Sequence, residues 1–580
     1  MKKLIIPVNL LLIFVWLNAC KKSGDFLDKK TSGNLNEAST FSDSAKTMDF
    51  LTGIYADIGF SFDPGRWEAG GHPVVSNESE PLRYVGPQND VVIMIGGAIS
   101  SQTTDASKNV QILNNWLTPY RNIRRVNLFL SKVDASPLSP ELRARLKAEA
   151  RFLRAWYYSI LLKCYGGIPL IGDKVFTPAE NIVLNRATYE ECVNYIVKEC
   201  DEAATLLPAK GEYAPGDYGR ITSGACLALK SRVLLYAASP LFNGGRPDVS
   251  GDIKPIVGYP AFSADRWQKA AAAAERVMSL SLYSLNEDNT TRPGYGFYKV
   301  FQVRAGNDEY ILPGMRAPGR DLEGGWLPPS RSGNYSSVPT QATVDMFDMI
   351  NGKPITDPAS GYDPAQPYKN RDPRFNNSIL YNGAPWFFAS TNKKDPINVT
   401  VNSNDGWSVS RPATTGYYIR KMLYEDGSGN TERCWPLIRY AEIVLNFAEA
   451  TNEYDGPVEP VYKALRDIRK RAGIDPGADN GYGLKAGMTK DEMRKAIHHE
   501  RMIELMFEEH KLWDARRWLR GEELLRGMAQ GVKVTAKAGG GFNYELFDIR
   551  QHVFSPNFYL FPIPEGEVSK APSLKQNPGW

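Results

Sequence analysis

This chain is poor in histidine and cysteine, and it has none of the short motifs that hold metals or nucleotides. Its 580 residues include five His and six Cys, with no CxxC pair and no HExxH, so a zinc site has no support. The GxSxG motif, the P-loop and the dinucleotide fingerprint are also missing. The formal charge is only +4, without a basic stripe or an acidic tail, which argues against a nucleic-acid partner. We therefore expect no cofactor and no metal ion.

The start of the chain has the pattern of an export signal. Two lysines follow the initiating Met, and the apolar run Leu4–Leu17 is too short to span a bilayer comfortably. The run ends in Leu-Asn-Ala-Cys, which resembles a bacterial lipoprotein cleavage site, and an ordinary signal peptide with a chance Cys is the alternative. The lipoprotein interpretation predicts a signal peptide at 1–19, an acylated Cys20 and a tether over 20–41.

Five cysteines remain after Cys20, and an odd number argues against a disulfide framework in an exported protein. Cys192 and Cys200 lie on one predicted helix, about 12 Å apart along its axis, which is beyond disulfide reach. We expect buried free thiols at Cys164, Cys192, Cys200, Cys226 and Cys434.

A helix over 140–164 is the stretch around which we expect the fold to be organised. Pro140 suits a first helical turn, and good helix formers follow it. The run Phe152–Leu162 is apolar on nearly every face, which predicts a helix buried between neighbours. Gly166 then offers a left-handed stop.

Similar helices before and after it predict a mainly α fold with a tetratricopeptide-like helical-pair scaffold. Ala148 and Phe152 have the small-to-large spacing by which paired helices pack closely, and Ala225 and Leu229 repeat it. Such pairs bury each other's apolar faces in a solenoid-like core. The predicted helices cover 42–58, 110–133, 140–164, 188–206, 222–240 and 263–281, followed by one that starts near 437, then 457–472 and 489–520.

The middle of the chain interrupts this scaffold. Residues 284–434 are rich in Gly, Pro, Asn and Tyr and almost free of helical periodicity, which predicts short strands and long loops with one short helix near 340–350. We therefore predict an N-terminal helical part at 42–283, a loop-rich ligand-binding insertion at 284–434, and a C-terminal helical part with an extended tail at 435–580. The three parts are expected to form one compact unit.

Two features invite a metal-binding or catalytic interpretation. His498, His499, Glu500 and His510 are clustered in the sequence without metal-ligand spacing. We favour a charged helix with ion pairs between residues three or four apart. Paired carboxylates for glycoside hydrolysis need only lie close in space, so the sequence leaves a hydrolase open as an alternative.

Four passages resemble, in the right order, the SusD/RagB family of outer-membrane nutrient-binding lipoproteins. They are EARFLRAWYYSILLKCYGGIPLI, RYAEIVLNFAEATNEY, HHERMIELMFEEHKLWDARRW and the terminal YLFPIPEGEVSKAPSLKQNPGW. With the lipoprotein-like start, the resemblance covers nearly the full chain. It implies a SusD-like fold, a lipid anchor in the outer membrane facing the cell exterior, and a SusC-like TonB-dependent transporter as partner.

The aromatic residues of the loops are the candidate binding residues. Flat Trp and Tyr rings match the apolar faces of sugars, and flanking polar side chains can bind hydroxyls, although ordinary packing is the competing interpretation for each ring. In starch-binding relatives, the first long loop and the central insertion line the ligand platform. By region, the resemblance therefore implies a ligand site at Trp67, Arg83, Tyr84, Tyr295, Tyr298 and Trp326.

Together these features predict a protein that captures an oligosaccharide without breaking bonds and delivers it to the transporter. A peptide is the alternative cargo, as in RagB-like uptake. A surface glycoside hydrolase and a structural helical-repeat adaptor are the alternatives from other classes.

Overall fold

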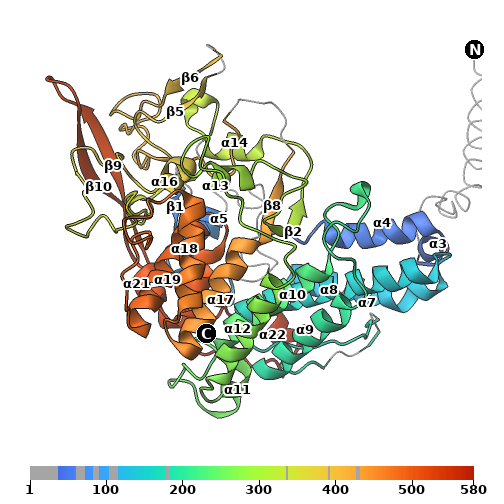
Figure 1. The fold of residues 1–580 in the computed structure, drawn as a ribbon. Coiled ribbons are helices and arrows are strands. Elements are labelled where there is room, and N and C mark those ends of the chain that lie inside the picture. Colours follow the sequence, from blue (N-terminus) through green and yellow to red (C-terminus); the bar gives the residue numbers. More distant parts are fainter. Residues whose placement is uncertain are drawn as a thin grey trace, which may run out of the picture.

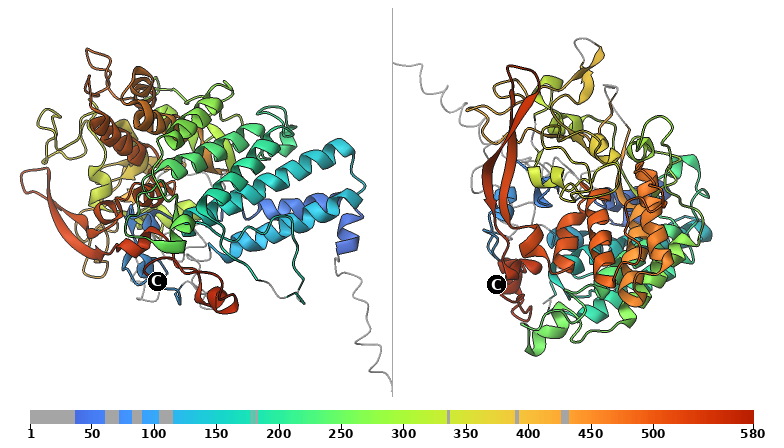
Figure 2. Two further views of the ribbon diagram at one scale, coloured as in Figure 1. Left: turned by 90° about the horizontal axis from the view of Figure 1, so that it is seen from below. Right: turned by 60° about the vertical axis from the view of Figure 1, so that its left-hand side comes forward.

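The computed structural model describes residues 37–60, 72–81, 90–103, 115–177, 179–180, 183–334, 337–388, 392–425 and 432–580. The predicted signal peptide and Cys20 lie outside these ranges. Within them, long helices form one side of the molecule, and a loop-rich part with short strands forms the other (Figures 1 and 2). No helix in the described ranges combines the length and the apolar character needed to cross a membrane.

The helices are α3 (Glu37–Phe41), α4 (Ser44–Tyr55), α5 (His72–Val75), α6 (Asp90–Ile95), α7 (Leu117–Lys132), α8 (Pro140–Tyr165), α9 (Tyr189–Ala204), α10 (Ser223–Ala238), α11 (Lys254–Val257), α12 (Asp265–Met278), α13 (Tyr295–Val300), α14 (Asp321–Trp326), α15 (Gln341–Asp345), α16 (Pro373–Ser378), α17 (Tyr440–Asp455), α18 (Glu459–Ala472), α19 (Lys490–Glu504), α20 (His510–Arg517), α21 (Gly521–Leu524) and α22 (Glu565–Lys570). The strands are β1 (Ser79–Glu80), β2 (Tyr310–Met315), β3 (Val338–Pro339), β4 (Ile379–Leu380), β5 (Pro385–Phe388), β6 (Lys393–Pro396), β7 (Tyr418–Ile419), β8 (Cys434–Arg439), β9 (Gly527–Ala536) and β10 (Phe542–His552).

Helix α8 is the predicted central helix. The Ser139 hydroxyl caps its first turn by accepting a hydrogen bond from Leu142, and Gly166 ends it at φ 77°. Every residue from Phe152 to Leu162 except Ser159 is buried. A helix whose side chains are buried on all faces needs neighbours on every side. Helices α7 and α9 both pack on α8. The expectation of a helix buried between neighbours is therefore confirmed.

The other long helices extend this packing into an array. Along the chain, α9 packs on α10, α10 on α12, and α12 on α17, which also contacts α18 and α19. Thr188 and Glu191 form the capping box of α9. The five cysteines that follow Cys20 are buried free thiols, as predicted. The mainly α, helical-pair scaffold predicted from the sequence is present.

The strands form small antiparallel pairs: β1 with β3, β2 with β8, β4 with β7, β5 with β6, and β9 with β10. The β9–β10 hairpin projects from the side of the molecule opposite α4 and α7 (Figure 1). The β2–β8 pair joins the loop-rich insertion directly to the start of α17.

Four sequence predictions of the fold are wrong in detail. The helix expected from residue 437 begins at Tyr440, because the preceding residues form β8. The single helix expected over 489–520 is broken into α19 and α20 where Phe507 and Glu509 take positive φ values of 60° and 66°. The insertion holds α13, α14 and α16 besides the expected short helix. The β9–β10 hairpin was not predicted.

Glu500, Arg501 and Glu504 of α19 are buried, and Glu504 does not make the expected pairs along its own helix. Glu504 is contacted by Arg439 of β8, Arg471 of α18 and Arg374 of α16. Each of these side chains is at most 1% exposed. The pairs therefore join separate elements instead of residues one helical turn apart. Removing one partner of such a buried pair leaves an uncompensated charge.

Candidate functional site

The six predicted ligand residues have different positions in the structure. Trp67, Arg83 and Tyr84 lie outside the described residues. Tyr295 and Tyr298 both belong to α13, which brings them together. Trp326 ends α14 and is 1% exposed.

The burial of Trp326 corrects its predicted role. Its neighbours Leu322 and Leu327 are also in the core. A ring enclosed in this way has no free face on which a sugar could stack, so we exclude Trp326 from the candidate site. Most of the other aromatic residues of the insertion are also in the core, including Trp386, Tyr417 and Tyr418.

The position of α13 depends on the glycine that precedes it. Gly294 has φ 70°, and a Cβ there would lie 2.9 Å from the carbonyl oxygen of Ala472 and 3.0 Å from Nδ2 of Asn377. The Asn377 amide donates to the Gly294 carbonyl at 3.2 Å and, through its oxygen, accepts from Arg292 at 3.3 Å. This places Arg292 and the first turn of α13 against α16 and the end of α18.

The two tyrosines of α13 stack on each other beneath an arginine. Their ring centroids are 5.9 Å apart with 29° between the planes. The Arg292 guanidinium carbon lies 4.9 Å from the centre of the Tyr295 ring and 5.0 Å from that of Tyr298. Tyr298 is buried and its hydroxyl accepts from the Glu425 backbone at 3.2 Å, whereas Tyr295 is only half-buried. Tyr295 is therefore the more accessible ring.

Positive charge surrounds these rings. The Glu425 carboxylate is 3.0 Å from Arg292, 2.6 Å from Arg420 and 3.5 Å from Lys394. Burial alone would raise the pKa of Glu425, but Arg420 and Arg292 outweigh it and lower that pKa. Burial lowers the pKa of Arg420. Three cations share one carboxylate here. Arg420 is buried, whereas Arg292 and Lys394 are partly exposed and have N–H groups available to other acceptors.

We call this group of side chains the α13 platform. Its accessible ring and its surrounding donors can contact the apolar face and the hydroxyl groups of a sugar at the same time. The platform consists of Arg292, Tyr295, Tyr298, Lys394, Arg420 and Glu425.

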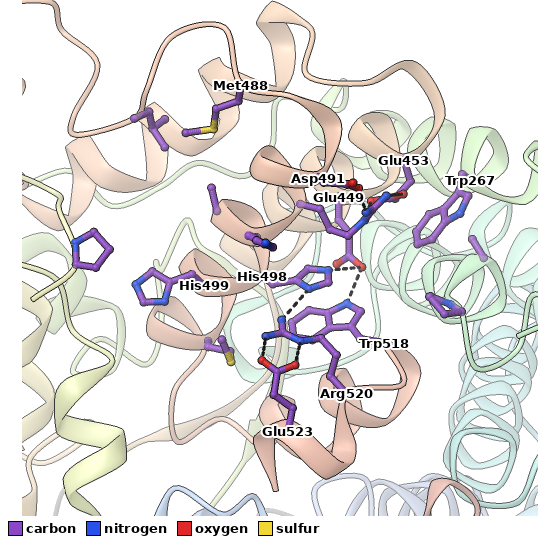
Figure 3. A pocket seen from close by; sticks show the side chains of 18 of the residues that line it. Trp267, Glu449, Glu453, Met488, Asp491, His498, His499, Trp518, Arg520 and Glu523 are labelled. Carbon is purple, nitrogen blue, oxygen red and sulfur yellow. Dashed lines mark hydrogen bonds and ion pairs between the residues drawn. The ribbon is translucent and has the colours of Figure 1, made fainter. Parts of the chain in front are cut away.

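The histidines are held by separate partners. His498 stacks on Trp518 with centroids 3.6 Å apart (Figure 3). His499 lies 2.8 Å from Asp348, and His510 is buried, with a pKa lowered well below its usual value mainly by that burial. In the part of the chain that the structure describes, no three His, Cys, Asp or Glu side chains are grouped as a metal site would require.

The carboxylates beside these histidines are poor candidates for a general acid. Arg517 and His498 hold the pKa of Glu449 well below its usual value, against the effect of burial, which alone would raise it. The bond from Arg520 lowers the pKa of Glu523. A glycosidase acid needs a raised pKa so that it stays protonated.

The chain also matches known protein families. The model of the SusD family matches residues 288–580. The chain belongs to the SusD family. A second model, described as starch-binding and associating with the outer membrane, matches residues 25–235. The SusD family therefore accounts for both halves of the chain, and the family resemblance expected from the sequence is confirmed.

Solved SusD-like structures share the fold. BT4246 superposes with a TM-score of 0.76 at 24% identity over 93% of this chain and 100% of that chain. A SusD-like protein from Bacteroides fragilis NCTC 9343 gives 0.73 at 24% identity over 93% and 98% of the two chains. A structure described as a laminarin-binding SusD-like protein gives 0.57 at 19% identity over 93% and 100%.

Curated SusD-like relatives come from Formosa agariphila. SusD-like protein P38 is 22% identical over 71% of this chain and 76% of its own length. SusD-like protein P2 is 26% identical, but that match spans only 30% of this chain and 31% of the relative.

Proposed function

We propose that this SusD-family chain binds an oligosaccharide at the α13 platform. The observation that carries the proposal is the half-buried Tyr295 ring, stacked on Tyr298 and flanked by Arg292. Ring stacking with adjacent donors is the arrangement that a sugar requires. The match to a family model described as starch-binding supports a carbohydrate as the ligand class. We retain Trp67, Arg83 and Tyr84 as further ligand residues on the grounds of the family resemblance.

The proposal includes the place and the fate of the ligand. Cys20 carries a lipid anchor in the outer membrane, the platform faces the cell exterior, and the bound oligosaccharide passes to a SusC-like TonB-dependent transporter. The lipoprotein-like sequence around Cys20 supports the anchor. The family description, which names the outer membrane, supports the location.

We further propose that binding is not followed by bond cleavage. The lowered pKa of Glu425, the carboxylate of the α13 platform, supports this, because a carboxyl that stays ionised is not suited to protonate a leaving group. The packed helices form a rigid scaffold, and the loops provide the ligand contacts.

The test compares the protein with its Tyr295→Ala variant on starch, laminarin, oligosaccharides from both and a peptide mixture. We expect the substitution to weaken carbohydrate binding by about ten-fold, or about 1.4 kcal/mol, in isothermal titration calorimetry. Val409→Ala, at a side chain 85% exposed elsewhere in the insertion, is the matched control.

Three results would contradict parts of the proposal. Unchanged carbohydrate affinity in Tyr295→Ala removes the platform from the site. Binding of peptides but not of carbohydrates would show that the ligand is a peptide instead of an oligosaccharide. Release of reducing ends by the unmodified protein replaces capture with hydrolysis.

A further inference from the structure

A cavity lies apart from the α13 platform. It has a volume of about 1100 Å³ and opens between the end of α10, the start of α12, α17, α19 and the α20–α21 turn (Figure 3). None of the side chains of the α13 platform lines it. Ligand pockets for drug-sized molecules occupy about 300–1,000 Å³, so this cavity has room for a larger ligand.

One face of α19 runs through the cavity. The lining residues Asp491, Arg494, His498 and Met502 are spaced three or four apart, so they form one stripe along the helix. The stripe is about 16 Å long, given the standard helical rise. We call this cavity the α19 groove. Its elongated shape suits an oligomer.

Aromatic side chains form the floor and the rim of the α19 groove. Trp267 of α12 and Trp518 line it while only 5% exposed each. The Trp518 indole donates to Glu449 at 2.8 Å and stacks on His498, so both rings are held in place. Phe262 stands at the rim with 67% of its surface exposed. Trp267 and Trp518 therefore only shape the floor, and Phe262 is the ring exposed for stacking on a flat ligand face.

The charges of the α19 groove cancel each other. Arg494 makes two hydrogen bonds to Glu453, of 2.5 and 2.6 Å, and Arg520 makes two to Glu523, of 2.7 and 2.5 Å. The lining contains five carboxylates and four Lys or Arg side chains. Burial lowers the pKa of His498, which therefore adds no charge at neutral pH. A groove that is nearly neutral overall but dense in donors and acceptors favours an uncharged ligand rich in hydroxyl groups.

The walls of the α19 groove argue against a peptide. Extended peptides bind mainly through hydrogen bonds to an exposed strand edge, and helical peptides bind through an apolar stripe. The groove is walled by helices and turns, and its lining residues from α19 include Asp491, Arg494 and Lys495. Side-chain hydrogen bonds and ring stacking are the contacts that it provides.

We propose that the α19 groove is a second saccharide-binding site, which takes an uncharged oligosaccharide independently of the α13 platform. The inference rests on the proposed function in one respect, namely that the chain binds glycans. Two sites on one chain would hold separate segments of a long glycan at once and raise the overall affinity above that of either site.

The test uses the full chain and the same starch and laminarin oligosaccharides. We expect calorimetry to find two sites on the unmodified protein, one of which is about ten-fold weaker in Tyr295→Ala. In the double variant Phe262→Ala, Glu523→Gln, the affinity of the groove should fall by about ten-fold or more, because both side chains lie at the rim and are exposed. Val409→Ala is again the control.

Hydrogen exchange gives an independent measurement. In Tyr295→Ala, added oligosaccharide should still slow amide exchange in the segments around residues 240–245 and 483–488 that border the groove. This protection should disappear in a triple variant that combines Tyr295→Ala with Phe262→Ala and Glu523→Gln. The inference is overturned if the groove variants keep the affinity and number of sites of the unmodified protein, or if the groove binds peptides instead. If Tyr295→Ala has no effect while the groove variants lose binding, the α13 platform is excluded as a ligand site and the α19 groove is retained as one. If no carbohydrate binds the unmodified protein, both proposals fail.

Discussion

Arg439 donates a hydrogen bond to Glu504 at 2.7 Å, and both side chains are buried. The arginine ends β8 and the glutamate ends α19, so this bond connects the β2–β8 pair to the C-terminal helices. Arg471 and Arg374 contact the same carboxylate. Burial alone would raise the pKa of Glu504, but the arginines hold it well below its usual value. The carboxylate is therefore ionised and shared by three elements.

Replacing Glu504 with Gln should strongly destabilise the fold. The substitution removes the one carboxylate that all three buried guanidinium groups share, so each keeps only its other partners: Glu309 and Glu508 for Arg439, Glu309 for Arg471, and Asp372 and Glu500 for Arg374. Breaking a buried pair costs about 3–5 kcal/mol. The measurement is the free energy of unfolding in denaturant. Glu459→Gln is the control, because its ion pair with Arg466 is largely exposed and should contribute about 1 kcal/mol or less. Equal effects of the two substitutions would contradict the prediction.

Stability should fall in acid. The folded-state pKa values of Glu504 and Glu449 are depressed, so each contributes stability that is present above the ordinary Glu pKa of about 4.3. That contribution is lost as the pH falls below this value, because protons then bind the unfolded state first. We expect the denaturant midpoint to drop between about pH 5 and 3. Glu504→Gln should flatten this dependence, and an unchanged slope in the variant would contradict the assignment.

Replacing Gly294 with Ala should disturb the α13 platform. The residue has φ 70°, and the added Cβ would meet the backbone of Ala472 at 2.9 Å. Gly361→Ala is a matched control, because Gly361 has φ 77° but no atom within 4 Å of the added Cβ. The control should lose about 1–2 kcal/mol from the positive φ alone. We expect Gly294→Ala to lose more and to weaken oligosaccharide binding, whereas the control should bind normally in calorimetry.

Asn577→Ala should destabilise the end of α8. The buried Asn577 amide donates to the carbonyls of Tyr165 and Phe561 at 3.0 and 2.7 Å and accepts from Arg186 at 2.8 Å. Leaving buried polar groups unpaired costs about 1–3 kcal/mol each, so thermal unfolding should shift down by several degrees. Lys575→Ala, whose side chain is half exposed, is the control and should change little. A shift of the same size in both variants would contradict the role of Asn577.

The helical scaffold could be predicted from the sequence because its determinants are local. Thr188 with Glu191 and Pro140 with Gly166 mark helix ends within a few residues of the helices they bound. The break between α19 and α20 could not be predicted in this way. Phe507 and Glu509 adopt positive φ values that their side chains disfavour, so packing with distant segments must impose them.

The β9–β10 hairpin had a signal that we overlooked. Val532 and Val534 alternate with polar residues, and Gly539 to Gly541 supply the turn. The candidate site was predictable only in part. Composition indicated that ring-bearing residues are abundant in the insertion, but only the fold determines which rings are enclosed, as Trp326 is, and which remain accessible, as Tyr295 does.

The contact of Asn577 with α8 has a consequence for biogenesis. Arg186 and Asn577 are 391 residues apart, so the hydrogen bonds of Asn577 to Arg186 and to the end of α8 form only after almost the entire polypeptide has been synthesised. The N-terminal helices therefore cannot complete this set of hydrogen bonds before the C-terminal segment has been made.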